Sequence, residues 1–187
     1  RLAVGREPSS VIIADVNGDG RQDLVVAEFL DNSVSVLLGL GGGQFGARRE
    51  FPTGTAPLGV GLGDLNADRI PELAVAWVGA SPGWGSVVTV LLGNGDGTFA
   101  PGHDYATAAG NWSVAIGDVN GDAKPDLATA NSSTASLSVF LNHGDGSFGT
   151  GTRYPTNGTP TSPGPTYLAV ADFDEDGHQD LVYARGI

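Results

Sequence analysis

The sequence predicts an all-β protein, and three observations support this fold class. Short apolar runs rich in Val and Leu alternate with Gly, Asn, Asp and Pro, which is typical of strands joined by turns. The stretch DVNGDGRQDLVVA, which begins at Asp15, returns with variations at Asp64, Asp118 and Asp172. Each return brings the same set of apolar runs, so the chain has a repeat of about 50 residues, a period typical of propellers and solenoids.

Four apolar runs in each repeat predict four short strands. The third and fourth runs are joined by Gly-rich stretches at 39–43, 93–97 and 142–146, which supply the positive φ of hairpin turns. Four antiparallel strands per repeat predict a β-propeller blade, whereas a solenoid of parallel strands would not need these hairpins. The runs are 10–14, 23–29, 33–38 and 44–51, then 58–62, 72–78, 86–92 and 98–105, then 112–116, 126–130, 136–141 and 147–154.

The repeat boundaries divide a single domain, 1–187, into about three and a half blades. We expect a partial propeller, because closed propellers have about four to eight blades. The unpaired strand edges would favour association. The chain is then part of a larger propeller or repeat array, although its first strand could instead complete the terminal half blade. The expected units are 1–7 (last strand of a preceding blade), 8–54, 55–108 and 109–158 (three blades) and 159–187 (first half of a further blade).

The recurring acidic stretch places oxygen-bearing side chains at positions 1, 3, 5 and 9 of a tight loop. Ca²⁺ takes about six to eight oxygen ligands, and alternate side chains of one loop can converge on such an ion. We therefore predict up to four Ca²⁺ ions, one in each loop, with the carbonyl at position 7 as a further ligand. The predicted ligands are Asp15, Asn17, Asp19, Arg21 and Asp23; Asp64, Asn66, Asp68, Ile70 and Glu72; Asp118, Asn120, Asp122, Lys124 and Asp126; and Asp172, Asp174, Asp176, His178 and Asp180.

Other interpretations of these loops fit the sequence less well. An EF-hand requires Glu at position 12 and flanking helices, whereas position 12 here lies in an apolar, strand-like run. Ordinary Asx turns would not require three or four mutually repelling carboxylates in one loop. Mg²⁺ retains several of its waters and is disfavoured. Gly at position 6 favours the first and fourth loops, because a positive φ would strain Arg69 and Ala123 at that position.

The loops and the runs that follow them resemble the FG-GAP / VCBS repeat family. The resemblance rests on four loops that match D-x-N-x-D-G-x-x-D-L fully or at most positions and on V-x-V-L-L-G-N-G-D-G-T-F at 88–99, and it covers nearly the whole chain. It implies an integrin-α-type propeller with a calcium loop in each blade, and a role in adhesion or in glycan or protein binding. We expect the calcium to be structural, because a bound cation removes carboxylate repulsion and adds its binding energy to folding.

Composition narrows the classes of partner. A net charge of −12 argues against nucleic acid and against anionic membranes, and 13 of the 21 acidic residues lie at predicted ligand positions. No apolar run approaches the roughly 18 residues of a membrane span, so no membrane insertion is expected. Cys is absent, which excludes disulfides and a Cys nucleophile. With no Met and no signal peptide at its start, the chain is expected to be a mature product or an excised piece.

These observations predict an extracellular module, secreted or at the cell surface, that binds a glycan or a protein and is not an enzyme. Millimolar extracellular Ca²⁺ would saturate weak loops of this kind. The sequence contains no H-E-x-x-H, P-loop or G-x-S-x-G motif. The alternatives are a subunit of an extracellular self-assembly or filament, formed through unpaired blade edges, and an accessory propeller of a larger secreted enzyme.

Candidate ligand contacts lie where the chain breaks its own period. Trp84 lies in an insertion at 79–86 and Trp112 in the stretch 108–113, and such aromatic rings can stack on sugars. Packing between blades is the alternative role for Trp112. The N-x-S/T sequons at Asn111, Asn131 and Asn157 are candidate glycosylation sites.

Overall fold

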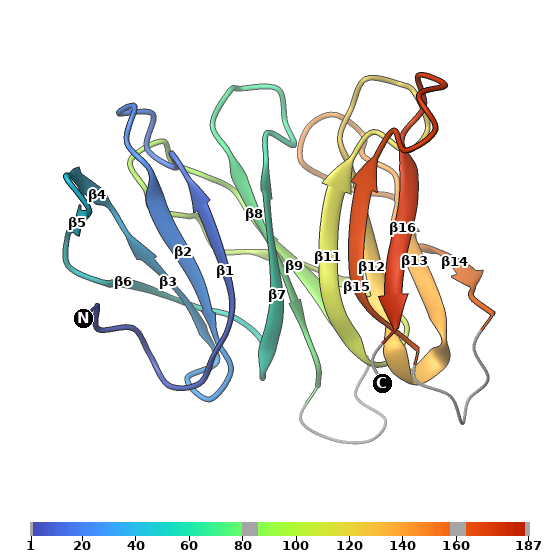
Figure 1. The fold of residues 1–187 in the computed structure, drawn as a ribbon, viewed down its shortest axis with the longest axis horizontal. Coiled ribbons are helices and arrows are strands. Elements are labelled where there is room, and N and C mark those ends of the chain that lie inside the picture. Colours follow the sequence, from blue (N-terminus) through green and yellow to red (C-terminus); the bar gives the residue numbers. More distant parts are fainter. Residues whose placement is uncertain (1, 80–85, 158–163, 186–187) are drawn as a thin grey trace.

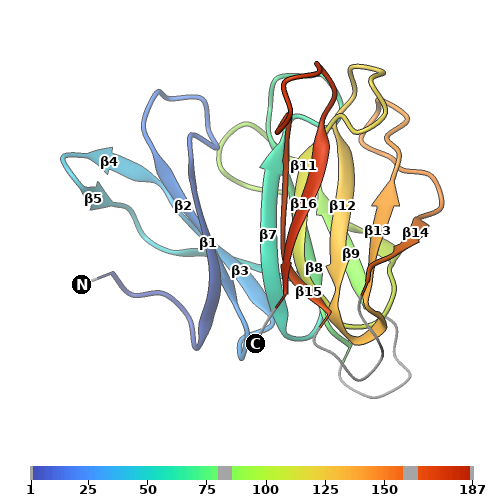
Figure 2. The same cartoon turned by 45° about the vertical axis from the view of Figure 1, so that its right-hand side comes forward.

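The computed structural model describes residues 2–79, 86–157 and 164–185 and confirms the all-β class. Three four-stranded antiparallel sheets and one two-stranded sheet follow one another in chain order, as blades placed side by side (Figure 1). The innermost strands of the four sheets are neighbours in space, and the described strands form no closed ring (Figure 2). A single 3-10 turn, Ser132–Thr134, is the helical element in these residues.

The strands of each blade are consecutive in the sequence. A small extra hairpin, β4 (Gly39–Gly41) with β5 (Gln44–Phe45), extends the first blade. The first blade contains β1 (Pro8–Ala14), β2 (Asp23–Glu28), β3 (Ser33–Leu37) and β6 (Arg49–Pro52); the second β7 (Pro57–Gly63), β8 (Glu72–Trp77), β9 (Val87–Leu91) and β10 (His103–Ala106); the third β11 (Asn111–Gly117), β12 (Asp126–Asn131), β13 (Ser136–Phe140) and β14 (Thr152–Pro155); the half blade β15 (Pro165–Ala171) and β16 (Asp180–Arg185).

The predicted fourth run of each repeat divides into two parts. Its first part closes the Gly-rich turn, where Phe45, Phe99 and Phe148 pair with residues two positions beyond the end of the third strand. The fourth strand proper begins only at Arg49, His103 or Thr152. The prediction of one continuous strand was wrong, because the closing phenylalanine belongs to the turn.

The N-terminal segment does not form the strand predicted for 1–7. Residues 2–7 run as coil, and no described strand lies beside them to supply ladder partners. The segment instead covers the end of β2, where the Phe29 N–H donates to the Glu7 carbonyl at 2.9 Å. The Gly5 N–H donates to the buried carboxylate of Glu28, which also binds Arg48 and Ser33.

Adjacent blades pack face to face and form the hydrophobic core. Between the first and second blades, side chains such as Val25 and Val36 meet Leu73, Val75 and Leu91. A second cluster, which includes Phe140, fills the space between the second and third blades. Burying each such side chain contributes roughly 1.5–3 kcal/mol. The second and third strands are buried on both faces, which explains their nearly continuous apolar runs.

The innermost strands of the second and third blades approach each other closely at Gly59. A Cβ added at Gly59 would lie 2.9 Å from the Ser113 Cα and 3.0 Å from the Trp112 carbonyl oxygen. A larger residue therefore does not fit here without separating the strands. No helix in the described part of the chain has the length and apolar character needed to cross a membrane.

Candidate metal-binding loops

Each acidic loop joins the first strand of a blade to the second. All four loops lie along one edge of the molecule, at the top in both views (Figures 1 and 2). Position 9 of each loop pairs with the last residue of the first strand, so the four loops have the same length and closure. These pairs are Asp23 with Ala14, Glu72 with Gly63, Asp126 with Gly117 and Asp180 with Ala171.

The four loops share one backbone conformation. Positions 4 and 6 are left-handed in every loop, whether or not the residue is glycine. The predicted positive φ at position 6 is confirmed: φ is 81° at Gly20, 70° at Arg69, 64° at Ala123 and 88° at Gly177. At position 4, φ is 72° at Gly18, 63° at Ala67, 76° at Gly121 and 62° at Glu175.

The carboxylate at position 1 holds the loop backbone from within. One of its oxygens accepts a hydrogen bond from the N–H of position 6, at 2.8 Å for Asp15, 2.9 Å for Asp64, 2.8 Å for Asp118 and 2.9 Å for Asp172. Burial acts to raise the pKa of Asp118, but N–H donors led by that of Ala123 outweigh it and hold the pKa below its ordinary value. The Asp118 carboxylate is therefore kept ionised.

Positions 3 and 5 form successive Asx turns that direct their oxygens into the loop. The position 5 N–H donates to the side-chain oxygen at position 3, at 3.1 Å for Asn17 and 2.9 Å for Asn66. The position 7 N–H donates to the position 5 carboxylate, at 2.9 Å for Asp19 and 2.7 Å for Asp68. The other two loops repeat these bonds, through Asn120 and Asp122, and through Asp174 and Asp176.

The structure brings positions 1, 3 and 5 together. In the fourth loop, where all three residues are acidic, carboxylate oxygens of Asp172, Asp174 and Asp176 lie within 4.8 Å of one another. Position 3 is Asn in the other three loops. The acid at position 9 is not a member of this group, although the sequence predicted four converging side chains. At position 7, Arg21 and Lys124 place their cations 3.5 and 3.7 Å from the position 5 carboxylates.

The acid at position 9 has a second role that the sequence did not reveal. One oxygen of Asp23 accepts from the Val16 N–H at 2.9 Å, and the other accepts from the Gly39 N–H at 2.6 Å. Asp126 makes the equivalent bonds, from the Val119 N–H at 3.1 Å and the Asn142 N–H at 2.9 Å. The side chain is buried and braces the loop against the turn that follows the third strand.

Burial makes two of these acids resist ionisation. Burial raises the pKa of Glu72 above its ordinary value, and the negative charges of Asp64 and Asp68 add to the effect. Burial likewise raises the pKa of Asp126, although hydrogen bonds from backbone N–H groups partly offset it. A cation placed beside either group would lower its pKa, because an opposite charge favours the ionised form.

The second loop contains an orphaned oxygen. Asp64 Oδ1 is buried and has no hydrogen-bond partner among the described residues. A buried acceptor without a partner costs about 1–3 kcal/mol, and more when it is charged. Because Glu72 is longer than Asp, it also reaches Asn66, whose Nδ2 lies 3.4 Å from Glu72 Oε1. The loop that the sequence favoured less therefore shows the clearest need for a further ligand.

The two aromatic residues predicted to contact a ligand are Trp84 and Trp112. Trp84 lies outside the described residues. Trp112 lies in strand β11, not in a loop, and its side chain is 47% exposed. It lines a cavity of about 140 Å³ together with Ser10, Ser113 and Tyr167, on the four innermost strands. Tyr167 is 72% exposed, and sequence analysis missed it because it continues an apolar strand pattern.

Two of the three sequons are buried in the fold. The Asn111 side chain is inaccessible and donates to the Val87 carbonyl at 2.9 Å. Asn131 is equally buried and hydrogen-bonds the Ser138 hydroxyl at 2.9 Å. Neither amide has room for a glycan in the folded chain, which contradicts the prediction at these positions. Asn157 is exposed.

Comparison with protein families identifies the repeat. The FG-GAP-like repeat model matches residues 15–75, 75–129 and 118–183. The chain belongs to this family. The FG-GAP-like repeats extend over all four acidic loops, which confirms the family that the sequence patterns indicated. No curated protein matches the chain.

Solved structures share the fold over most of this chain. BBS1N, in a crystal structure of its complex with ARL6DN soaked with lead, aligns with 95% of this chain and 51% of its own, with a TM-score of 0.62 and 16% identity. The V. cholerae biofilm matrix protein Bap1 aligns with 87% of this chain and 30% of its own, with a TM-score of 0.44 and 20% identity. The Photorhabdus luminescens Tc holotoxin pore aligns with 96% of this chain and 11% of its own, with a TM-score of 0.36 and 18% identity. The chain thus spans about half of BBS1N, and the likeness concerns the fold alone.

Proposed function

We propose that this chain is a calcium-binding β-propeller module of an extracellular, non-catalytic protein that recognises a glycan or a protein. Membership of the FG-GAP-like repeat family supports an extracellular location. The observation that carries the calcium proposal is the orphaned Oδ1 of Asp64, a buried acceptor within a group of oxygen ligands. The common conformation of the loops extends the proposal to all four.

The residues present fit a hard divalent cation. In each loop, positions 1, 3 and 5 supply converging side-chain oxygens. Position 9 supplies a further carboxylate, which is buried in the first three loops. Such a set of oxygen donors matches Ca²⁺, which accepts carboxylates, amide oxygens and carbonyls. Bound calcium would neutralise carboxylates that otherwise repel each other, so its role is to stabilise the folded repeat. The carbonyls at position 7 complete the proposed set.

Calcium titration of the purified chain tests this proposal. An ion at 100 times its Kd stabilises the fold by about 2.7 kcal/mol. For a chain of this size each kcal/mol shifts Tm by about 2–4 °C, so one site gives a rise of about 5–10 °C over chelated protein. Isothermal titration calorimetry then counts the sites. Mg²⁺ at the same concentration should give a smaller rise.

The fourth loop offers a matched pair of variants. Asp176→Asn removes a proposed ligand charge while keeping an oxygen for the His178 N–H. Glu175→Gln removes one charge from the neighbouring exposed residue, which is not a proposed ligand. We expect only the first variant to lose a calcium site. Equal calcium binding by both variants, or an unchanged Tm in chelator, would overturn the proposal.

The cavity on the innermost strands supports a recognition role. Trp112 and Tyr167 present aromatic surface there, and the Ser10 and Ser113 hydroxyls have no hydrogen-bond partner within the described residues. No charged residue lines the cavity. Aromatic faces beside free hydroxyl groups match a neutral sugar ring better than a charged ligand, so we propose a glycan as the ligand.

Glycan-array binding followed by tryptophan fluorescence titration tests the glycan proposal. Replacing Trp112 or Tyr167 by Ala should weaken binding about two- to tenfold, since an aromatic contact contributes about 0.5–1.5 kcal/mol. Leu40→Ala, at an exposed apolar residue of the β4–β5 hairpin, is the control and should bind as the parent does. If neither aromatic substitution changes the affinity for the glycan, the recognition site lies elsewhere on the chain.

A further inference from the structure

The second and third acidic loops, 64–72 and 118–126, are neighbours in space. Both line one cavity of about 440 Å³, to which the second loop contributes Leu65 and the third contributes Pro125. Gly144 lines the same cavity, so the Gly-rich turn of the third blade lies against both loops. The two loops and this turn therefore form one continuous group of residues.

Asn142, the first residue of the turn, connects the two loops through a single side-chain amide. Its Nδ2 donates to the Leu65 carbonyl and to the Pro125 carbonyl, each at 2.8 Å. Its Oδ1 accepts from the Gly144 N–H at 2.7 Å, and the Gly146 N–H adds a bond to the Leu65 carbonyl at 3.1 Å. The side chain is only 3% exposed. Both amide hydrogens are thus committed to the loops, at a site that excludes water and strengthens these bonds.

Both ends of this connection reach proposed calcium ligands. In the second loop, the Leu65 N–H donates to Glu72 Oε2 at 2.6 Å, so Glu72 and the Asn142 amide hold the N–H and the carbonyl of one residue. The orphaned oxygen of this loop belongs to Asp64, the residue just before Leu65. In the third loop, the Asn142 N–H donates to Asp126 Oδ1 at 2.9 Å. A displacement of either loop therefore acts on ligands of the other.

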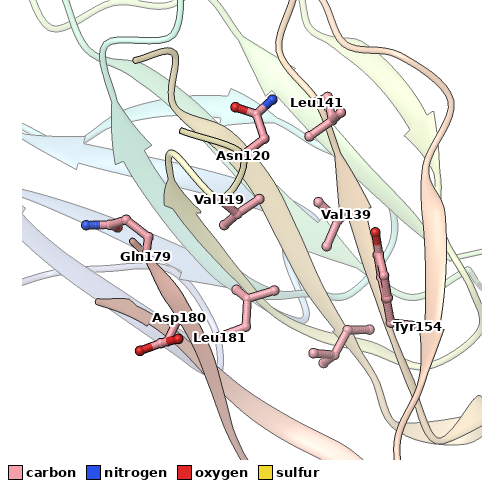
Figure 3. Close-up of a pocket in the computed structure, with 9 residues that line it drawn as sticks. Val119, Asn120, Val139, Leu141, Tyr154, Gln179, Asp180 and Leu181 are labelled. Atoms are coloured by element: carbon pink, nitrogen blue, oxygen red, sulfur yellow. The ribbon is translucent and has the colours of Figure 1, made fainter. Parts of the chain in front are cut away.

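The third loop also lies beside the chain that leads into Asn142. Val119 and Asn120 of this loop line a cavity of about 470 Å³ together with Leu141, the residue before Asn142 (Figure 3). The Val119 N–H donates to Asp126 Oδ2 at 3.1 Å, while the other oxygen of Asp126 binds the Asn142 N–H. The position of Asn142 therefore depends on how the third loop is folded.

The two junctions between complete blades share one aromatic contact. Phe51 of the first blade meets Phe99, from the Gly-rich turn of the second blade, edge-on at 5.5 Å. Tyr105 of the second blade meets Phe148, from the turn of the third blade, edge-on at 5.4 Å. The turns thus dock on the preceding blade through the same pair, which makes the two junctions a matched comparison.

The junction between the first and second blades lacks the amide connection. The residue equivalent to Asn142 is Gly93, which has no side-chain amide. A Cβ on Gly93 would lie 2.4 Å from the Pro71 carbonyl oxygen, so asparagine does not fit there without a backbone shift. Among the described residues, no backbone N–H of the second blade's turn donates to the carbonyl of Val16, the equivalent of Leu65. The first and second loops are therefore not joined in this way.

We infer that Asn142 couples the second and third loops, so that calcium bound in one raises the affinity of the other. The inference rests on the proposed function, because it concerns the same loops. Binding orders a loop, and a loop already held by an ordered neighbour costs less to order when its own ion binds. Coupling between sites typically changes affinity about 5–150-fold. For one connecting amide we expect the low end, about fivefold.

Calcium titration followed by NMR measures each loop separately. The amides at position 4 report the first, second and third loops: Gly18, Ala67 and Gly121. Asp68→Asn removes a proposed ligand charge from the second loop and keeps an oxygen for the Ile70 N–H. Asp19→Asn is the matched change in the first loop, where the Arg21 N–H makes the same bond. While the altered loop is empty, Asp68→Asn should weaken the third loop about fivefold, and Asp19→Asn should leave it unchanged.

Asn142→Ala shows whether the amide carries the coupling. The variant keeps the backbone N–H that Asp126 binds and removes only the amide. In this background, Asp68→Asn should no longer change the affinity of the third loop. Because both comparisons remove the same charge, its direct electrostatic effect cancels and the difference measures the connection. Circular dichroism checks folding, and the comparison of Asp68→Asn with Asp19→Asn remains decisive if Asn142→Ala does not fold.

Reciprocity supplies a second test. Asp122→Asn, in the third loop, should weaken the second loop by the same factor, because coupling between two binding sites is mutual. An unchanged third loop in Asp68→Asn, equal weakening by Asp68→Asn and Asp19→Asn, or an effect that persists without the Asn142 amide would overturn the inference. In each of these cases the loops still bind calcium and the proposed function stands. Absence of calcium-dependent shifts in every loop would overturn both.

Discussion

The left-handed residues of the acidic loops allow the backbone to be tested apart from any ion. Ala123 holds φ at 64° at position 6 of the third loop, where the first loop has Gly20. A left-handed conformation costs an L-residue roughly 1–2 kcal/mol. Ala123→Gly removes this strain but adds about 0.4–1 kcal/mol of conformational entropy to the unfolded chain. The net expectation is a gain of about 0.5–1 kcal/mol.

The reverse change at the equivalent position is a matched control. A Cβ added to Gly20 meets no atom within 4 Å, so Gly20→Ala changes only the backbone preference. It should lose about as much stability as Ala123→Gly gains. The two loops lie in different blades, so the double variant should restore the parent stability by additivity.

Urea unfolding in chelator, followed by circular dichroism, measures both changes. With m near 1–3 kcal/mol/M, a gain of this size raises the midpoint by about 0.2–1 M. Loss of stability in Ala123→Gly, or no change in Gly20→Ala, would refute the left-handed geometry and the shared loop conformation built on it.

Three further predictions concern the scaffold. Burial acts to raise the pKa of Glu28, but hydrogen bonds, led by that of Ser35, outweigh it and hold the pKa below its ordinary value. Its stabilising contribution is therefore present above the unfolded pKa of about 4.3 and is lost as pH falls through the lower folded pKa. Glu28→Gln should cost about 1–3 kcal/mol at neutral pH and little in strong acid; a difference in unfolding free energy that does not vary with pH would contradict this. Leu73→Ala, in the fully buried core, should cost about 2–5 kcal/mol in urea unfolding, whereas the exposed Leu40→Ala should change little. Gly59→Ala should lower Tm through the close approach of β7 and β11, at a cost of about 1–3 kcal/mol; Gly46→Ala, whose Cβ would meet only the Leu38 carbonyl oxygen at 3.6 Å, is its control, and equal Tm values would refute the packing argument.

The features that the sequence predicted correctly depend on short-range patterns. The first three strands of each blade and the acidic loops follow from local alternation, turn residues and repetition. The positive φ at position 6 was also predictable, because glycine occupies it in two of the four loops. The strain at Arg69 and Ala123 then followed from comparison among the repeats.

The features that were missed depend on residues far apart in the chain. The bracing role of Asp23 requires the Gly39 N–H, which lies beyond two strands. Asn111 and Asn131 match a local sequon, but neighbouring strands bury them, and no local pattern reports that burial. Tyr167 reads as an ordinary strand residue, and its exposure depends on how the innermost strands are arranged. The division of the fourth run was missed because the turn phenylalanine is apolar like a strand residue.

The pairing of an aromatic residue in one blade with the turn phenylalanine of the next has a consequence for how such chains evolve. The junction between the first and second blades and the junction between the second and third blades use the same aromatic pairing, so duplication of one whole repeat creates a new junction that already matches both of its neighbours. Gene-level change in this architecture should therefore proceed by complete repeats.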